Sequence, residues 1–301
     1  MVTPTRAEGV ARLGLPMTDL AMIAVVLIWG MNFSLSKIAL QELPPLPFAA
    51  LRFSAGAVLL WLLLRRLEPP RPLPPGALWK LTWIGIVGNT FYQVGFTYGL
   101  KLTSAANAAL LIAATPALVA GFGALLGIEP LRRNTIYGIA LAFGGAALVL
   151  AARGLHFTAG GIVGDLMLLG CAVCWTIYTL GVRTVGSGLS PLAITTWTMV
   201  TGAPGLLLVS LPDILRVDWA ALSLTTWACL GYATLLALVL AYVLWNNSVR
   251  VVGTNRTAVY GCAIPLCAAL FAWPLLGEQP TWLQAAGGAL IIGGVLLTRR
   301  S

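Results

Sequence analysis

Charged residues are scarce in this sequence. Only 9% of its 301 residues are Asp, Glu, Lys or Arg, whereas a soluble domain carries about 25%. Hydrophobic residues make up 59% of the chain. This balance excludes an ordinary soluble protein and indicates a chain that works within a lipid bilayer.

Histidine and acidic residues are also few. The single histidine, His156, falls in a predicted loop, and seven of the nine acidic residues fall in loops or at helix ends. An intramembrane serine protease needs a Ser/His pair, a metal-dependent transferase needs clustered acids, and haem or zinc needs clustered His or Cys. We therefore expect a protein that is not an enzyme and holds no metal or cofactor. A membrane enzyme, receptor or scaffold is a lesser alternative.

The two other acidic residues bear on energy coupling. Asp19 is predicted to cap the first helix, and Asp165 to lie about one turn inside the sixth. Proton-driven exporters usually carry a carboxylate or a histidine at membrane depth. We therefore predict uniport or exchange down a gradient, without obligatory proton coupling, and Asp165 is the residue that tests this prediction.

Long apolar runs fill most of the chain. A transmembrane helix needs about 20 mostly apolar residues. Ten such segments follow one another, at 19–40, 45–66, 78–100, 103–126, 133–152, 160–183, 190–211, 219–247, 253–275 and 281–298. The predicted fold class is therefore all-α and integral to the membrane, with ten transmembrane helices.

The positions of the basic residues predict the orientation. Twelve of them fall on the side of the N-terminus, whereas Lys101, Arg153 and Arg216 fall on the other side. Because loops rich in Lys and Arg stay in the cytoplasm, both termini are predicted to be cytoplasmic. The net charge of +9 follows from this topology, so no nucleic-acid partner is expected.

The chain contains an internal repeat. Trp29 and Lys37 recur as Trp175 and Arg183, each pair being separated by 146 residues. Five helices per copy is an odd number, so the second copy enters the membrane upside down. Inverted repeats of this kind are typical of secondary transporters, in which one bundle moves against the other to give alternating access.

The later part of each copy repeats at a different offset. There the offset is 149, which pairs Pro116 with Pro265. Because proline removes an intrahelical hydrogen bond and bends a helix, these two residues are candidate hinges, with fixed kinks as the alternative. The predicted organisation is a cytoplasmic tail (1–18), a first five-helix repeat (19–152) and a second, inverted repeat (160–298).

Four motifs cover much of the chain. They are W-G-x-N-F-x-x-x-K at 29–37, PFAALRF at 47–53, the run from 102 to 149, and LLGEQPTWLQAAGGALIIGGVLL at 275–297. The sequence resembles the drug/metabolite transporter superfamily, EamA type, in these motifs, and within it bacterial exporters of aromatic and neutral amino acids (YddG type). It departs from the family pattern at 127–129, which reads GIE. The resemblance implies ten helices, a central substrate cavity and export of small metabolites.

Polar and aromatic side chains at membrane depth are the candidates for substrate binding. Because a charge at a helix centre costs about 2.5–3.5 kcal/mol in membrane insertion, such groups usually face the bundle interior. Trp29 and Trp175 are predicted to flank one cavity from opposite sides. The whole predicted set is Trp29, Asn32, Asn89, Tyr92, Gln93, Trp175, Tyr178, Tyr242, Trp245 and Tyr260. The alternative is that these side chains join helices or anchor the protein at the membrane surface.

An aromatic cavity with amide groups suits a ligand that is part apolar and part zwitterion. The rings would hold a side chain or an ammonium group, and the amides would hold a carboxylate. Arg52 and Arg256 also lie deep in their segments. Buried cations would favour an organic phosphate or a nucleotide sugar. Amino-acid export is the first prediction, and transport of phosphates or nucleotide sugars is the alternative.

Two basic residues lie near opposite membrane faces. Lys37 and Arg183 either extend to the interface or each border one mouth of the cavity as a gate. Glycines that form close-packing faces, for a scaffold or an oligomer contact, are Gly138, Gly144, Gly145, Gly287, Gly293 and Gly294.

The overall composition bears on the cellular location. Fifteen Arg against three Lys, with abundant Ala, Gly and Leu, indicates a bacterial inner-membrane protein. The expected partners are a small-molecule substrate and the lipid bilayer. The oligomeric state is left open.

Overall fold

The computed structural model describes residues 15–70, 72–128, 133–151, 159–185 and 188–299. All secondary structure assigned within these ranges is helical, which confirms the predicted fold class at that level. The stretches long and apolar enough to cross a membrane are Met17–Ala39, Pro45–Leu67, Asn107–Leu125, Gly161–Val185, Pro191–Ile214 and Leu224–Val252. Their number supports a chain that crosses the bilayer several times.

The described residues of the first half form seven α-helices and one π-helix. They are α1 (Leu15–Ala39), α2 (Pro45–Leu67), α3 (Ala77–Gly85), the π-helix η1 (Ile86–Phe91), α4 (Tyr92–Leu102), α5 (Ala105–Ile112), α6 (Thr115–Leu125) and α7 (Arg133–Ala151). The prediction that Asp19 caps the first helix is wrong, because α1 begins at Leu15. Pro16 suits a first helical turn, where its missing N–H has no intrahelical partner to lose.

The second half repeats this order of elements. They are α8 (Ala159–Val185), α9 (Pro191–Ile214), α10 (Leu224–Thr234), the π-helix η2 (Leu235–Leu240), α11 (Ala241–Val252), α12 (Thr254–Tyr260), the 3₁₀-helix η3 (Gly261–Ala263), α13 (Ile264–Leu276) and α14 (Trp282–Arg299). The two π-helices begin 149 residues apart (235 − 86). The structural repeat therefore has the same offset as the sequence repeat in this part of the chain.

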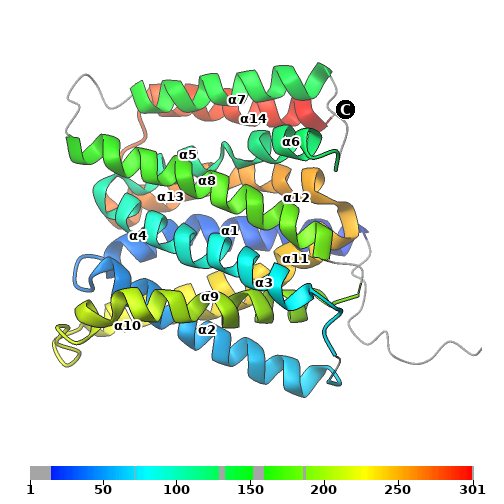
Figure 1. Ribbon diagram of the computed structural model, residues 1–301. Helices are drawn as coiled ribbons and strands as arrows, with labels where there is room; N and C mark the ends of the chain where they lie inside the picture. The colour runs from blue at the N-terminus through cyan, green and yellow to red at the C-terminus, as the bar shows by residue number, and fades with distance from the viewer. Residues whose placement is uncertain (1–14, 71, 129–132, 152–158, 186–187, 300–301) are drawn as a thin grey trace, which may run out of the picture.

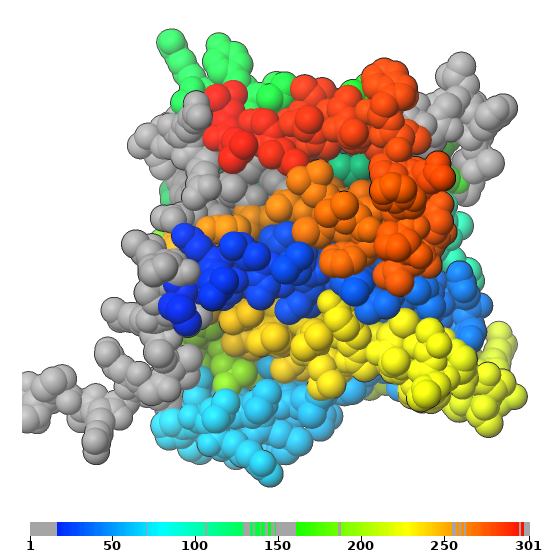
Figure 2. Space-filling model, turned by 180° about the vertical axis from the view of Figure 1, so that it is seen from behind, coloured from blue at the N-terminus to red at the C-terminus, as the bar shows by residue number. Residues whose placement is uncertain are grey.

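Helices of the two halves pack against one another in pairs. α7 lies beside α14 at one edge of the molecule, and α2 lies beside α9 near the other edge (Figure 1). α1 packs against α13, α10 and α11, and from behind it runs between the orange and yellow segments of the second half (Figure 2). Much of the core of the protein is therefore built between the halves.

Close helix contacts depend on glycine at two places. A Cβ atom on Gly145 of α7 would lie 2.6 Å from the carbonyl oxygen of Gly287 in α14. A Cβ atom on Gly85 would lie 2.3 Å from the carbonyl oxygen of Thr198 in α9. Both distances are far shorter than a carbon–oxygen contact allows, so a larger residue would push the paired helices apart.

Candidate functional site

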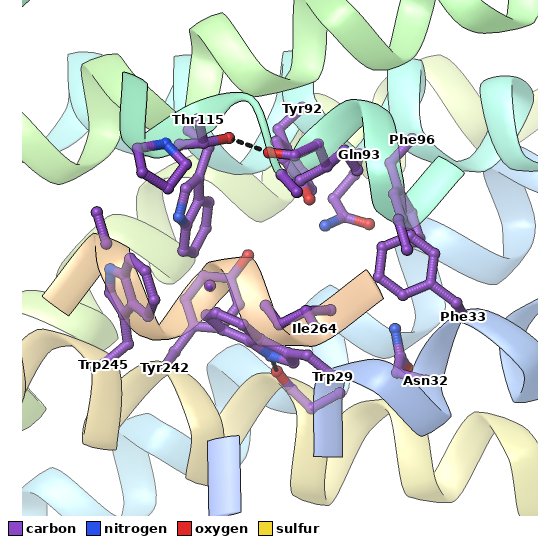
Figure 3. Close-up of a pocket in the computed structure, with 18 of the residues that line it drawn as sticks. Trp29, Asn32, Phe33, Tyr92, Gln93, Phe96, Thr115, Tyr242, Trp245 and Ile264 are labelled. Atoms are coloured by element: carbon purple, nitrogen blue, oxygen red, sulfur yellow. Dashed lines mark hydrogen bonds between the residues drawn. The ribbon is translucent and has the colours of Figure 1, made fainter. Parts of the chain in front are cut away.

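A cavity of about 70 Å³ lies between the two halves of the molecule (Figure 3). Its walls come from α1, α2, α4, α5 and α6 in the first half. In the second half they come from α8, η2, α11, α12, η3 and α13. The cavity thus lies where the two repeats meet, which is also where transporters with inverted repeats place their substrate sites.

Seven of the residues predicted to bind substrate line this cavity. They are Trp29, Asn32, Tyr92, Gln93, Trp175, Tyr242 and Trp245. They lie on four α-helices, namely α1, α4, α8 and α11. Residues more than 200 positions apart in the sequence are brought together because α1 crosses the second half of the chain.

The aromatic residues form one continuous wall. The ring centroids of Trp29 and Trp175 are 5.5 Å apart, with an edge-to-face angle of 85°. Trp245 lies 5.1 Å from Trp29, and Tyr242 lies 5.2 Å from Trp175. Such pairs are favourable because the positive ring edge meets the negative ring face. The two repeat-related tryptophans are therefore in direct contact.

The π-helix η2 lines the cavity, and η1 ends directly before two lining residues. Tyr92 and Gln93 follow η1 directly, and Tyr242 comes two residues after the end of η2. The indole N–H of Trp29 donates a hydrogen bond of 2.9 Å to the carbonyl oxygen of Ala237, which lies within η2. π-helical turns occur frequently at functional sites, because they disturb the regular pattern of helix hydrogen bonds.

Three predicted residues lie away from the cavity wall. The amide of Asn89 donates to the carbonyl oxygen of Thr198 at 2.8 Å, which joins η1 to α9. Tyr178 stacks behind Trp175 at 4.9 Å, and its hydroxyl accepts a hydrogen bond from Asn246 at 2.9 Å. The hydroxyl of Tyr260 bonds to the carboxylate of Asp19. These contacts join helices, in line with the alternative stated above.

Twelve further residues complete the lining. They are Phe33, Arg52, Phe96, Ala109, Ile112, Ala113, Thr115, Pro116, Ala237, Ala258, Gly261 and Ile264. Phe33 and Phe96 were detectable from the sequence, because they follow Trp29 by four positions and Gln93 by three, on the same helix face. The alanines and the glycine carry no such signal. Small residues line cavities and pack helices equally well.

Arg52 is the charged residue in the cavity wall. It is 3% exposed, and its guanidinium carbon lies 5.1 Å from the ring centre of Phe48 and 5.8 Å from that of Phe53. Its Nε and Nη1 atoms have no hydrogen-bond partner among the described residues. The side chain of Arg256, the other cation predicted to be deep, lies outside the described part of the structure.

Lys37 is held by protein groups at one end of the cavity region. Its ammonium donates to the carbonyl oxygen of Thr103 at 2.6 Å and lies 3.1 Å from the carboxylate of Glu278. That carboxylate also accepts the backbone N–H of Ala105 at 3.1 Å. The two charged side chains are 27% and 18% exposed. This group of contacts joins α1 to the start of α5 and to the end of α13.

Arg183, the repeat counterpart of Lys37, has different neighbours. Its side chain is exposed, and its Nη1 atom is 3.5 Å from the carbonyl oxygen of Val249. Within the described ranges no carboxylate forms an ion pair with it. Glu129, the sequence counterpart of Glu278, lies outside those ranges.

The predicted hinge prolines lie where helices are interrupted. Pro116 is the second residue of α6, just after the break that separates α5 from α6. Pro265 is the second residue of α13, just after the 3₁₀-helix η3. Each proline therefore stands in the first turn of a new helix, where it fits without loss of a hydrogen bond, and both breaks border the cavity.

Metal ligation has no visible basis in the described ranges. No group of three or more His, Cys, Asp or Glu side chains there is placed to hold an ion. Among the described residues, the cavity lining consists of aromatic rings, two amides, the Thr115 hydroxyl, apolar residues and the Arg52 guanidinium. This arrangement can bind an organic solute by stacking and hydrogen bonding.

Comparison with known proteins gives consistent matches along the chain. The model of the EamA-like transporter family matches residues 16–151 and 162–300. An uncharacterized transporter of Archaeoglobus fulgidus is 31% identical, over 93% of this chain and 96% of its own. A probable amino-acid metabolite efflux pump of Salmonella typhimurium is 27% identical, over 91% and 92%. One crystal structure shares the fold with a TM-score of 0.67 at 22% identity, covering 94% of this chain and 98% of its own.

Proposed function

Because the chain belongs to the EamA-like transporter family, we propose that it exports small metabolites, above all neutral or aromatic amino acids, as YddG-type transporters do. The observation that carries this proposal is the cavity between the repeats, with an aromatic wall and two amide side chains, Asn32 and Gln93. Further support comes from the Salmonella relative, whose name describes a probable amino-acid metabolite efflux pump.

The chemistry of the cavity suits an amino acid. Indole and phenol faces accept an apolar or aromatic side chain by stacking, and polar groups at one end can hold the charged backbone groups. The cavity of about 70 Å³ is small compared with an engineered cavity of about 150 Å³ that takes up benzene. Loading of an aromatic amino acid therefore requires the wall to move, as alternating access demands.

Contacts between the repeats close the bundle at both ends, and the proposed movement breaks them at one end at a time. Lys37 and Glu278 join the repeats at one end, and Tyr260 and Asp19 join them at the other. In our proposal ten helices in two inverted repeats (19–152 and 160–298) open one end at a time, bending near Pro116 and Pro265. In this proposal the protein lies in a bacterial inner membrane with both termini in the cytoplasm, so the Lys37 end faces away from the cytoplasm.

We propose transport down a gradient, by uniport or exchange. The cavity lining contains no acidic residue and no histidine among the described residues, so a substrate-coupled proton has no evident carrier there. Asp165, which is buried in α8, is the test. Loss of transport driven by a pH gradient in the Asp165→Asn variant would contradict this part of the proposal.

The first experiment measures flux into liposomes that contain the purified protein. Labelled tryptophan, phenylalanine, leucine and a nucleotide sugar are supplied with and without a pH gradient. Saturable amino-acid flux, independent of the gradient and lost in Trp29→Ala, is expected. Flux of the nucleotide sugar alone would contradict amino-acid export and establish the alternative. Absence of any flux, with ligand binding retained, would favour a receptor.

A further inference from the structure

Arg52 is a buried cation without a buried anion. It lies in the cavity wall, it is 3% exposed, and it has no ion pair among the described residues. The faces of Phe48 and Phe53 stabilise it through cation–π attraction. They provide no hydrogen-bond acceptor for its Nε and Nη1 atoms, which have no partner in the described part of the chain. A guanidinium buried in this way is strongly unfavourable unless an anion reaches it.

Helix positions place Asn32 at about the same depth in the bundle as Arg52, and Gln93 about 3 Å deeper. Arg52 comes seven residues after the start of α2 (52 − 45), and Asn32 comes seven residues before the end of α1 (39 − 32). At a rise of about 1.5 Å per residue, both lie about 10 Å from the loop that joins these helices. Gln93 comes nine residues before the end of α4 (102 − 93), which the Lys37–Thr103 hydrogen bond places at the same end.

The amides lack partners for their oxygen atoms. Oδ1 of Asn32 and Oε1 of Gln93 are buried and accept no hydrogen bond from the described residues. Figure 3 shows Asn32 and Gln93 at one end of the cavity, together with Phe33 and Phe96, and Trp245 at the opposite end. This end of the cavity thus offers two acceptors beside Phe33 and Phe96, and the helix positions given above place Arg52 near the same depth, whereas the opposite end offers the indole of Trp245.

We propose that Arg52 binds the carboxylate of an α-amino acid, while Asn32 and Gln93 accept hydrogen bonds from its ammonium group. This assignment rests on the proposed function and narrows it to substrates that carry both charges on adjacent groups. The guanidinium can hold both carboxylate oxygens at once. The substrate side chain then lies along the wall formed by Trp29, Trp175 and Trp245.

The test compares phenylalanine with two analogues that lack its carboxylate and with inorganic phosphate. Liposomes with the wild-type protein take up labelled phenylalanine in the presence of unlabelled phenylalanine, phenylalanine amide, phenethylamine or inorganic phosphate. We expect phenylalanine amide and phenethylamine, which lack the carboxylate, to compete on the order of 10- to 100-fold more weakly than phenylalanine, as expected for loss of a hydrogen-bonded charge. Equal competition by phenethylamine would overturn the proposal without any variant.

Variants then assign the effect to Arg52. Arg52→Gln should lose phenylalanine affinity on the order of 10- to 100-fold and lose its preference over phenethylamine, whereas Arg52→Lys should retain part of both. Arg65→Gln is the matched control, because Arg65 lies on the same helix, is exposed and contacts Trp61; we expect wild-type flux. If Arg52→Gln does not fold, the preference of Arg52→Lys and the wild-type competition decide.

The possible failures are distinguishable. No amino-acid flux in the wild-type protein contradicts the proposed function itself. Phenylalanine flux that Arg52→Gln leaves unchanged, with unchanged preference, contradicts the role of Arg52 and leaves the function standing. Competition by phosphate that disappears in Arg52→Gln, with phenylalanine unaffected, would show that the guanidinium serves a phosphate ligand and would overturn the carboxylate assignment.

Discussion

Lys37 and Arg183 hold equivalent positions in the two repeats, yet they meet different groups. Each reaches a backbone carbonyl 66 residues further along the chain, Lys37 at 2.6 Å and Arg183 at 3.5 Å. Lys37 also meets the carboxylate of Glu278, and the described residues offer Arg183 no such partner. The end of the bundle near Arg183 is joined instead through Tyr260 and Asp19.

This difference shows that a shared position in the repeat does not imply a shared binding partner. The repeat determines where a side chain lies on its helix and at which depth. The binding partner of that side chain depends on which segments of the two halves pack beside it. These segments differ between the two ends of the molecule. Unequal contacts at the two ends stabilise one end more than the other, so they shift the balance between conformations that open different ends.

The largest expected effect concerns the paired tryptophans of the wall. Trp175 is 6% exposed and stacks on Tyr178, so Trp175→Ala should lower the free energy of unfolding by about 3–5 kcal/mol. Trp29 is less buried, and Trp29→Ala should cost less even though it removes the hydrogen bond to Ala237. Denaturant unfolding in detergent measures both, with the exposed Trp79→Ala as control. Equal losses would contradict the comparison.

The next effect breaks the ion pair at the Lys37 end. Lys37→Met or Glu278→Gln should weaken closure of that end by about 1–2 kcal/mol, since each change breaks an ion pair whose two side chains are only 27% and 18% exposed. The measurement follows the labelling rate of a cysteine placed in the cavity wall by Ala109→Cys. Wild-type and variant chains both have their native cysteines replaced. An impermeant thiol reagent should label it on the order of 10-fold faster from that side.

A double variant and a control sharpen the same measurement. Lys37→Met together with Glu278→Gln should raise the labelling rate by less than the product of the two single effects, because both changes remove the same ion pair. Lys101→Met lies near the same end with an exposed side chain and should label like the parent. Additive effects of the two single changes would mean that the side chains act independently.

A smaller effect is expected at the equivalent cation. Arg183→Met should change the free energy of unfolding by less than about 0.5 kcal/mol, because the side chain is exposed and its carbonyl contact is long. The labelling rate of the same cavity cysteine should also stay unchanged. An effect as large as that of Lys37→Met would show that Arg183 has a strong partner at its own end.

The smallest effect is a pH dependence in the loop next to Lys37. The pKa of Glu42 is held below its usual value of 4.5 by the Thr226 hydroxyl first, then by the backbone N–H and hydroxyl of Ser223. A carboxyl whose pKa is lower in the folded state adds stability above its unfolded pKa and loses it as the pH falls through the folded value. Glu42→Gln should therefore unfold slightly below the wild-type temperature at pH 7, and the difference should shrink below pH 4.5.

Sequence reasoning was most informative where residues recur at a fixed offset. The pairs Trp29 and Trp175, and Pro116 and Pro265, indicated positions that the structure brings to the cavity or to the helix breaks beside it. The partner of Lys37 could not be found in this way. Glu278 lies 241 residues away (278 − 37), and the contact depends on how the two halves meet.

The orientation of polar groups was likewise hidden in the sequence. Asn32 and Asn89 are both amides within apolar segments, but Asn32 lines the cavity and Asn89 bonds to α9. Asn89 can reach α9 because Gly85 and Gly202 let the two helices approach closely. Such an approach involves small residues on two distant segments, and neither segment alone reveals it.

The two π-helices change which side chains share a helix face. A stripe of Asn89, Gln93 and Phe96 follows the ordinary spacing of four and three residues, but η1 ends at Phe91, inside that stripe. A π-helical turn contains one residue more than an α-helical one. The residues that follow it are therefore rotated by about one position around the helix axis. The same rotation at η2 determines the helix face on which Tyr242 and Trp245 lie. A single-residue deletion in either π-helix would therefore turn the cavity residues that follow it away from the cavity.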